Sequence, residues 1–179
     1  KYAGRPPLDQ VLCETAVARS KPLYGLETVQ EHIGAMTALT AAEQEAFLRA
    51  ACQSILDAKG EKKDPFAPLL NAYLRGDMAG LTASFARDRE LAKKYMPAAL
   101  YDKIMTGLLA ERNVRMTKAV AARLAAAPQR TGFFAVGAGH MIGKTGLVEA
   151  LRKKGYTVTR IKAAVAPTII PAAKPAKAA

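Results

Sequence analysis

The chain has 179 residues, half of them apolar, which is enough for one domain with a sizeable core. Its net charge is +12, yet lysines and arginines are scattered, and no clustered basic face or nucleic-acid-binding motif is visible. The composition excludes a disordered chain and argues against a nucleic-acid partner. No run of about 18 apolar residues occurs, so we expect no membrane-spanning helix.

The chain has two cysteines, Cys13 and Cys52. They form no CxxC motif and have no histidine at ligand spacing, which excludes a structural metal held by cysteines. One disulfide in an oxidising compartment and two buried thiols are equally consistent with the sequence.

The first part of the chain predicts two helices around a short strand. Residues 8–19 place apolar side chains at helical spacing. Residues 22–26 are apolar and short, as in a buried strand, and Glu27 follows the end of that strand. Thr28 can cap the next helix, which we expect over residues 29–38.

The middle of the chain predicts further helices with clear start signals. Thr40 and Glu43 form a capping box that opens a helix to about residue 58. An Asp-Pro pair at residues 64–65 begins a helix that ends at residue 74, because an Asp is a favourable cap and Pro a favourable first residue.

A Gly-Asp pair at residues 76–77 separates that helix from the next, which we expect over residues 79–93. A long helix follows Pro97 and continues to about residue 126. Gly107 lies inside it, and we expect a break there.

Residues 131–160 read as a βαβ unit. A strand over 132–136 leads into a Gly-rich turn over 137–143, then a helix over 145–154 that stops at Gly155. A second strand follows over 156–161, and such a connection makes the two strands parallel.

The sequence therefore predicts an α/β fold, mostly α by content, in which a small parallel-strand sheet carries a large helical insertion. The insertion covers residues 29–127 of a domain over residues 1–161. Residues 162–179 form a tail rich in Ala, Pro and Lys.

His140 is the strongest candidate for chemistry. It lies in the turn at the carboxyl end of a predicted strand, where ligands bind in open parallel sheets. Gly137, Gly139 and Gly143 surround it and let a ligand approach closely. A lone loop histidine more often caps a backbone group or faces water, but its position favours a functional role.

Glu27 is the second candidate. If the strands are parallel, it lies at the same sheet edge as His140, where a carboxylate and an imidazole can bind a metal or share a proton. Stabilisation of the following helix by the helix dipole explains Glu27 equally well. His32 is five residues further on and does not match the chelate spacing of a helix, so we interpret it as structural.

Arg112 and Asn113 are the third candidate. One apolar stripe of the predicted long helix contains Asn113; its other members are Leu109, Met116, Val120 and Leu124. A buried Asn must be hydrogen-bonded, so it ties the helix to the sheet or to the site. Periodicity alone slightly favours a structural contact.

Residues 138–145 also fit a relaxed P-loop, in which backbone amides and Lys144 hold phosphates and Thr145 binds Mg²⁺. Only one strand is predicted after this motif, and no acidic residue follows Glu149 to hold the metal. We therefore regard nucleotide binding as the weaker alternative.

The combination of motifs resembles the TraB/PrgY/GumN family, which is related to the Tiki proteases. The resemblance is fairly specific toward the bacterial GumN-like branch and covers about residues 8–161. The resembling segments, in the order of the family, are residues 21–28 (KPLYGLET), 74–77 (LRGD), 111–113 (ERN), 135–143 (AVGAGHMIG), 146–148 (GLV), 151–152 (LR) and 155–156 (GY).

The resemblance implies an α/β fold with helical insertions and two halves, each with a Gly-x-x-His motif, of which residues 137–140 match the second. It implies a metal-dependent, peptidase-like hydrolase that uses Mn²⁺ or Co²⁺. Carried onto this chain, His140 is a metal ligand or catalytic residue, Glu27 its acidic partner, and Arg112 orients a substrate carbonyl. We assign Asn113, Gly137 and Gly139 to substrate binding.

The chain departs from the family pattern in two ways. The first Gly-x-x-His motif is absent, and the chain begins at Lys1, so we expect a piece of a longer polypeptide. His32 stands where this branch usually shows Gln, and it is either neutral or an additional ligand. We expect a peptide or small-molecule substrate and, by analogy, a location in the cell envelope or outside the cell. A non-catalytic peptide-binding module and an oligomer remain open.

Overall fold

The computed structural model describes residues 4–61 and 64–161, and the chain divides into two compact units. The described residues of the first unit are 4–25 and 161, and those of the second are 26–61 and 64–160. In the described part of the first unit, α1 (Leu8–Ala18) is the helical element and follows Pro7. It confirms the helix that the sequence predicts there. The predicted tail lies outside the described residues.

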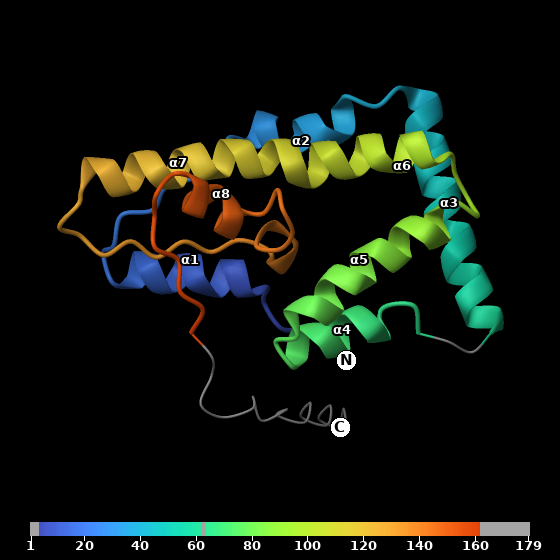
Figure 1. Ribbon diagram of the computed structural model, residues 1–179, viewed down its shortest axis with the longest axis horizontal. Coiled ribbons are helices and arrows are strands. Elements are labelled where there is room, and N and C mark those ends of the chain that lie inside the picture. Colours follow the sequence, from blue (N-terminus) through green and yellow to red (C-terminus); the bar gives the residue numbers. More distant parts are fainter. Residues whose placement is uncertain (1–3, 62–63, 162–179) are drawn as a thin grey trace, which may run out of the picture. The chain divides into compact units, whose positions relative to one another are not determined.

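The second unit holds the remaining helices of Figure 1. They are α2 (Val29–Thr37), α3 (Ala41–Gly60), α4 (Ala67–Leu74), α5 (Met78–Ala92), α6 (Ala98–Met105), the π-helical segment η1 (Thr106–Glu111), α7 (Arg112–Ala126), the 3₁₀ turn η2 (Ala138–His140) and α8 (Leu147–Lys153). All helices predicted from the sequence are present, with boundaries shifted by a few residues.

Side-chain caps explain where the central helices begin. Thr40 accepts a hydrogen bond from the Glu43 backbone, and the Glu43 carboxylate accepts one from the Thr40 backbone, which confirms the predicted capping box. Asp77 caps α5 by accepting from Gly80 N at 2.9 Å. Gly76 ends the preceding segment with φ +62°, a left-handed conformation that glycine adopts at little cost.

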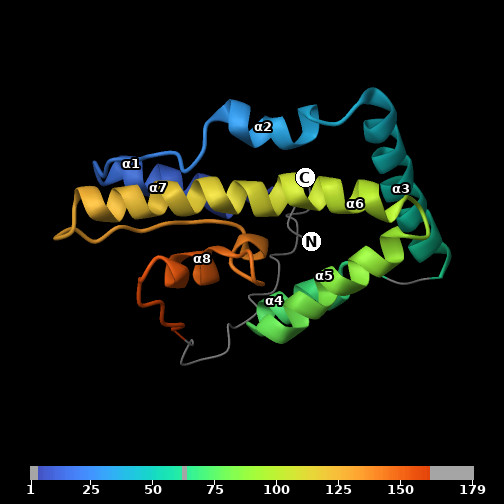
Figure 2. The same cartoon turned by 45° about the horizontal axis from the view of Figure 1, so that its top comes forward.

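Helices α6 and α7 form one continuous rod through η1 (Figure 1). Gly107 lies in η1, where the sequence predicts a break. A π-helical segment widens the backbone spiral without ending the helix. Helix α2 packs against η1 and α8 against α7, on different sides of the rod (Figure 2). The rod therefore joins the segments that carry Glu27 and His140.

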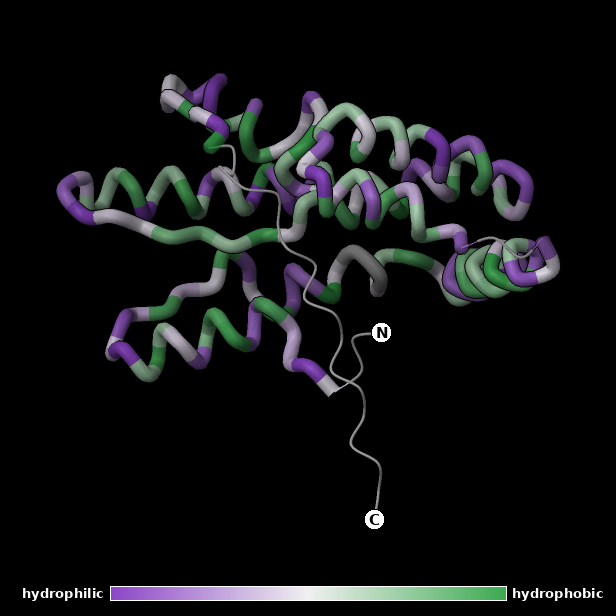
Figure 3. Tube along the Cα trace, turned by 90° about the horizontal axis from the view of Figure 1, so that it is seen from below, coloured by the Kyte–Doolittle hydropathy of each residue, from purple (hydrophilic) through white to green (hydrophobic). Residues whose placement is uncertain are grey.

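The apolar core of the second unit is small. Hydrophobic and hydrophilic residues alternate along the helices, as in amphipathic helices (Figure 3). The buried apolar residues include Ile104 on α6, Met116 and Val120 on α7, and Leu147 on α8. Asn113 and His140 are among the few buried polar residues. Such buried polar side chains need hydrogen-bond partners inside the protein.

The predicted parallel sheet is wrong for the described residues. Residues 22–26, 132–136 and 156–161 have irregular backbone and no ladder of hydrogen bonds joins them. A strand is stabilised by hydrogen bonds to a neighbouring strand, and none of these three described segments has such a partner. The expected mostly helical content is confirmed, whereas the α/β class is not. The assignment of residues 29–127 as an insertion stays a prediction.

Two further expectations concern the surface. Cys13 and Cys52 are both free and exposed, so the alternative of two buried thiols is wrong. Cys13 lies in the first unit and Cys52 in the second, and the alternative of a disulfide stays a prediction. Within residues 4–61 and 64–161, no helix combines the length and the apolar composition needed to cross a membrane.

Candidate functional site

His140 is held in a tight turn at the start of the C-terminal part of the second unit. Gly137 begins the turn, and the His140 backbone N–H donates to the Gly137 carbonyl at 2.9 Å. A Cβ at Gly139 would come within 3.1 Å of the Phe85 ring on α5, so Gly139 permits close packing of the turn. His140 itself is 7% exposed. The histidine of this turn is therefore buried, and Gly139 lets the turn pack against α5.

The buried imidazole is hydrogen-bonded to Asn113. The His140 Nδ1 and Asn113 Oδ1 atoms are 2.7 Å apart, and Asn113 Nδ2 donates to the Thr145 carbonyl at 2.9 Å. Asn113 is 2% exposed. The expectation that a buried Asn must be hydrogen-bonded is confirmed, and its partners are the candidate histidine and the loop that follows it.

Arg112 and Glu27 form a second pair beside this one. Arg112 Nε donates to Glu27 Oε2 at 3.0 Å, and Arg112 Nη2 donates to Glu27 Oε1 at 2.5 Å. This is the bidentate geometry that makes an arginine–carboxylate pair strong. The side chains are 14% and 12% exposed, respectively. Hydrogen bonding to Arg112 lowers the pKa of Glu27 to about 2, against the opposing effect of burial, so Glu27 is ionised at neutral pH.

His32 lies next to both members of this charged pair. Its spacing in the sequence did not indicate this position. Its Nδ1 lies 3.0 Å from Glu27 Oε1 and 3.1 Å from Arg112 Nη2. Glu27 precedes α2 and is not part of the helix, so spacing along a helix does not describe how the two residues meet. The sequence signal that could have indicated this contact is the Thr28 cap, because the cap determines the direction in which the chain enters α2. Thr28 Oγ1 accepts a hydrogen bond from Glu31 N at 3.2 Å.

The two pairs belong to one electrostatic environment. Burial lowers the pKa of His140, and the Arg112 charge lowers it further, while the Glu27 charge acts in the opposite direction. His140 is therefore neutral at neutral pH. Arg112 and Asn113 are consecutive residues at the start of α7. Arg112 contributes to the pair with Glu27, and Asn113 contributes to the pair with His140.

The donor set is incomplete for a metal ion. Within the described residues, no group of three or more His, Cys, Asp or Glu side chains comes close enough to hold one. Both Glu27 oxygens accept from Arg112, and His140 offers one free nitrogen, Nε2. Metal sites need three or more protein ligands, or fewer with several waters. These residues alone do not fit a protein metal centre.

The P-loop alternative lacks its structural context. Helix α8 begins at Leu147, after Lys144 and Thr145 rather than at them, and no strand precedes the loop among the described residues. The Thr145 carbonyl accepts from Asn113 instead. A phosphate-binding loop needs the strand before it and its Lys-Thr pair in the first turn of the helix.

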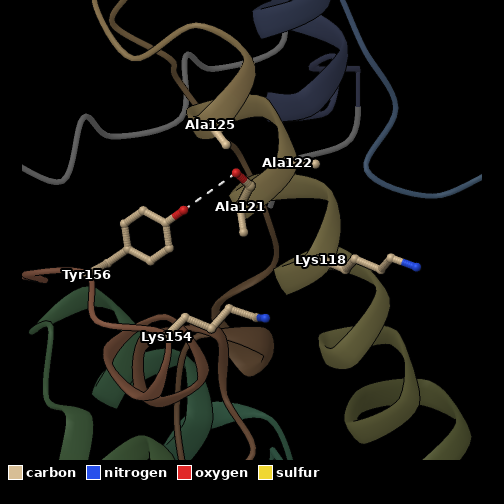
Figure 4. Close-up of a pocket in the computed structure, with 6 residues that line it drawn as sticks. All are labelled: Lys118, Ala121, Ala122, Ala125, Lys154 and Tyr156. Carbon is tan, nitrogen blue, oxygen red and sulfur yellow. Dashed lines mark hydrogen bonds between the residues drawn. The ribbon is translucent and has the colours of Figure 1, made fainter.

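A shallow depression of about 460 Å³ lies elsewhere on the second unit (Figure 4). Its floor is apolar, and the Tyr156 hydroxyl at its edge donates to the Ala121 carbonyl at 3.5 Å. The residues that line it are Lys118, Ala121, Ala122, Ala125, Lys154 and Tyr156. None of them is a carboxylate, a histidine or a thiol, so the depression lacks the side chains that usually bind a metal.

Comparison with known proteins identifies relatives of the chain. It is 27% identical to the metalloprotease TIKI1 of Danio rerio over 172 residues, which are 88% of this chain and 34% of the relative. It is 27% identical to a metalloprotease TIKI homologue of Nematostella vectensis, over 90% of this chain and 37% of the relative. A homologue from Amphimedon queenslandica is 31% identical over 52% of this chain and 17% of the relative.

The chain thus spans about a third of the length of the first two of these relatives. No solved structure matches it significantly. The model of the TraB/PrgY/gumN family matches residues 1–160, which include every residue of the site described above. The chain therefore belongs to the TraB/PrgY/gumN family.

Proposed function

We propose that the chain contributes part of the active site of a metal-dependent hydrolase that acts on peptides. The observation that carries the proposal is His140, a buried imidazole held through Nδ1 by Asn113, whose Nε2 has no hydrogen-bond partner among the described residues. An imidazole anchored at one nitrogen and free at the other is typical of metal ligands and of general bases. The names of the relatives, which are metalloproteases, support the same reading.

A divalent metal, Mn²⁺ or Co²⁺ by the resemblance, would supply Lewis-acid polarisation and an activated water. The described residues provide one free donor for it, His140 Nε2. Further donors would have to lie outside the described residues. We therefore derive no step through a metal. The role of Glu27 as a ligand stays a prediction, since both of its oxygens accept from Arg112.

Arg112 is suited to orient a carbonyl. A guanidinium has five N–H groups. Three of them donate to acceptors: two to Glu27 and one, from Nη1, to the Leu108 carbonyl at 3.3 Å. A fourth, on Nη2, faces His32 Nδ1 at 3.1 Å, an atom that is a donor when it bonds to the Glu27 carboxylate. One Nη1–H has no partner among the described residues. Glu27 fixes the guanidinium plane, so this remaining donor is held ready for a substrate oxygen.

The three other proposed substrate-binding residues differ in their surroundings. A Cβ at Gly137 would meet only His140 Cδ2, at 3.7 Å, so a substrate backbone has room beside Gly137. Gly139 faces Phe85, and the amide of Asn113 bonds to His140 and Thr145. Gly137 is thus the best supported of the three as a contact for substrate.

The test is a Mn²⁺ titration followed by NMR of the two imidazole rings. Paramagnetic Mn²⁺ broadens signals of the groups that it approaches, even when binding is weak. We expect selective broadening of the His140 ring relative to the His32 ring. Metal binding measured by calorimetry should be lost in His140→Ala and kept in Asn71→Ala, a change at an exposed position of α4. Unchanged affinity in His140→Ala, or broadening of the His32 ring without that of the His140 ring, would remove His140 as the ligand.

A second candidate is a non-catalytic module that binds peptides. The observation that favours it is the engagement of Glu27 by Arg112 together with the incomplete donor set. In this case, binding of a peptide partner would survive His140→Ala. A hydrolase would lose turnover in that variant, so peptide-cleavage and peptide-binding assays of the same variant separate the two candidates.

A further inference from the structure

The orientation of the Asn113 side chain is determined by a backbone group. The nitrogen and oxygen of an amide side chain are hard to tell apart by shape, so hydrogen-bond partners must decide between them. One partner of Asn113 is the Thr145 carbonyl oxygen, which can only accept. Nδ2 must therefore face Thr145, and Oδ1 must face His140.

The Asn113 orientation in turn determines the proton on His140. An amide oxygen only accepts hydrogen bonds, so the Nδ1 atom that lies 2.7 Å from it must carry the hydrogen. A neutral imidazole has one N–H, and its other nitrogen, Nε2, then has a lone pair. No described residue donates to Nε2 or accepts from it.

The loop after His140 holds the Thr145 carbonyl in place. Gly143 has φ +76°, a left-handed conformation, and the Gly146 N–H donates to the Gly143 carbonyl at 3.1 Å. A Cβ at Gly146 would collide with the Ile142 carbonyl. Gly146 is therefore required by the backbone of this loop, which directs the Thr145 carbonyl to Asn113.

We propose that Asn113 is a positioning residue that, anchored by the Thr145 carbonyl, holds His140 in the Nδ1–H tautomer with the Nε2 lone pair free. Free histidine prefers the opposite tautomer, with the hydrogen on Nε2, in which Nε2 can neither bind a metal nor accept a proton. The tautomer stands independently of the hydrolase, whereas its use in catalysis rests on the proposed function.

The test is ¹⁵N NMR of the imidazole rings in the metal-free protein. The chain has two histidines, so His32 provides an internal reference in an uncrowded spectrum. The measurement is made at about pH 9, well above the ordinary histidine pKa of roughly 6.5. We expect His140 Nδ1 to resonate as a protonated nitrogen and Nε2 as an unprotonated one. A protonated Nε2 in the wild type would overturn the proposal without any variant.

Two substitutions separate positioning from packing. Asn113→Leu removes the acceptor at similar volume, and we expect His140 to change from one dominant tautomer to a majority of Nε2–H. Asn113→Asp keeps an acceptor for Nδ1 but loses the donor to Thr145, so we expect Nδ1 to stay protonated. If Asn113 had only a structural role, Asn113→Asp should disturb the His140 ring more than Asn113→Leu does, because the Asp charge would be buried against the Thr145 carbonyl.

Asn71→Leu is the matched control, since Asn71 is exposed on α4 and its substitution should leave the His140 spectrum unchanged. Persistence of the Nδ1–H tautomer in Asn113→Leu would overturn the proposal. If Asn113→Leu does not fold, the wild-type and Asn113→Asp spectra still decide it. A failed Mn²⁺ titration would contradict the hydrolase but leave the tautomer result standing.

Discussion

The two halves of the site are stabilised by different physics. The Glu27–Arg112 pair is charged and bidentate, and it joins segments 85 residues apart. The His140–Asn113 pair is neutral and more deeply buried, and it depends on the direction of each hydrogen bond. A charged pair tolerates small displacements because Coulomb attraction falls slowly with distance, whereas a neutral hydrogen bond weakens steeply with angle. We therefore expect Glu27–Arg112 to govern stability and His140–Asn113 to govern chemistry.

Removal of Arg112 should have the largest effect on stability. Arg112→Ala leaves the largely buried Glu27 carboxylate without its cation, and we expect a loss of about 3 kcal/mol in the free energy of unfolding. Arg89→Ala is the matched control. Arg89 also pairs with a carboxylate through two hydrogen bonds, at 2.7 and 2.6 Å to Asp102, but the two side chains are 43% and 48% exposed.

We expect Arg89→Ala to cost less than about 1 kcal/mol, because water screens the exposed pair. Urea unfolding of both variants provides the comparison. Equal losses in the two variants would show that burial does not distinguish the pairs and that Glu27–Arg112 is an ordinary surface contact.

We expect the Glu27–Arg112 pair and the His140–Asn113 pair to lose their contributions to stability in different ranges of acidic pH. The Glu27 pKa is lowered from 4.5 to about 2, so between these values the unfolded chain binds more protons than the folded one. Stability from Glu27 is therefore present above about pH 4.5 and is lost as the pH falls through about 2. Glu27→Gln should remove the part of this slope that Glu27 contributes; Asp57, whose pKa is also lowered to about 2, contributes another part.

The pKa of His140 is also lowered, from 6.5, mainly by burial. The unfolded chain again binds the proton first, so the contribution of His140 is present above about pH 6.5 and declines as the pH falls below it. His140→Gln should remove that part of the slope and leave the part due to Glu27. Urea unfolding measured from pH 8 to pH 2 checks both statements. If Glu27→Gln and His140→Gln changed the free energy of unfolding over the same pH range, the two residues would not titrate separately.

Gly139→Ala should have a smaller effect on stability, and this effect should be confined to the turn that holds His140. The new Cβ would lie 3.1 Å from the Phe85 ring, so the ring or the turn must shift, and we expect a cost of about 1 kcal/mol. In a Phe85→Leu background, the same substitution should cost less, because the smaller side chain removes the contact. A double-mutant cycle without coupling would show that Phe85 does not constrain the turn.

Local patterns in the sequence identified the helices and several residues of the site. The Thr40 capping box, the glycine stops and the apolar stripe with its embedded Asn113 all depend on residues within about four positions of each other. Such signals do not depend on distant parts of the chain. The same reasoning selected His140 and Glu27, but it placed them at the edge of a sheet that the described residues do not form.

The sequence by itself determined the helical segments, the buried polar position in α7 and the family. The tertiary structure decided which side chains pair: Arg112 with Glu27, His32 with both, and Asn113 with His140 and Thr145. It also decided that the predicted strands do not pair. The physical reason is range, since helix bonds and caps form between neighbours, whereas strand ladders and polar partners require distant segments to meet in one geometry.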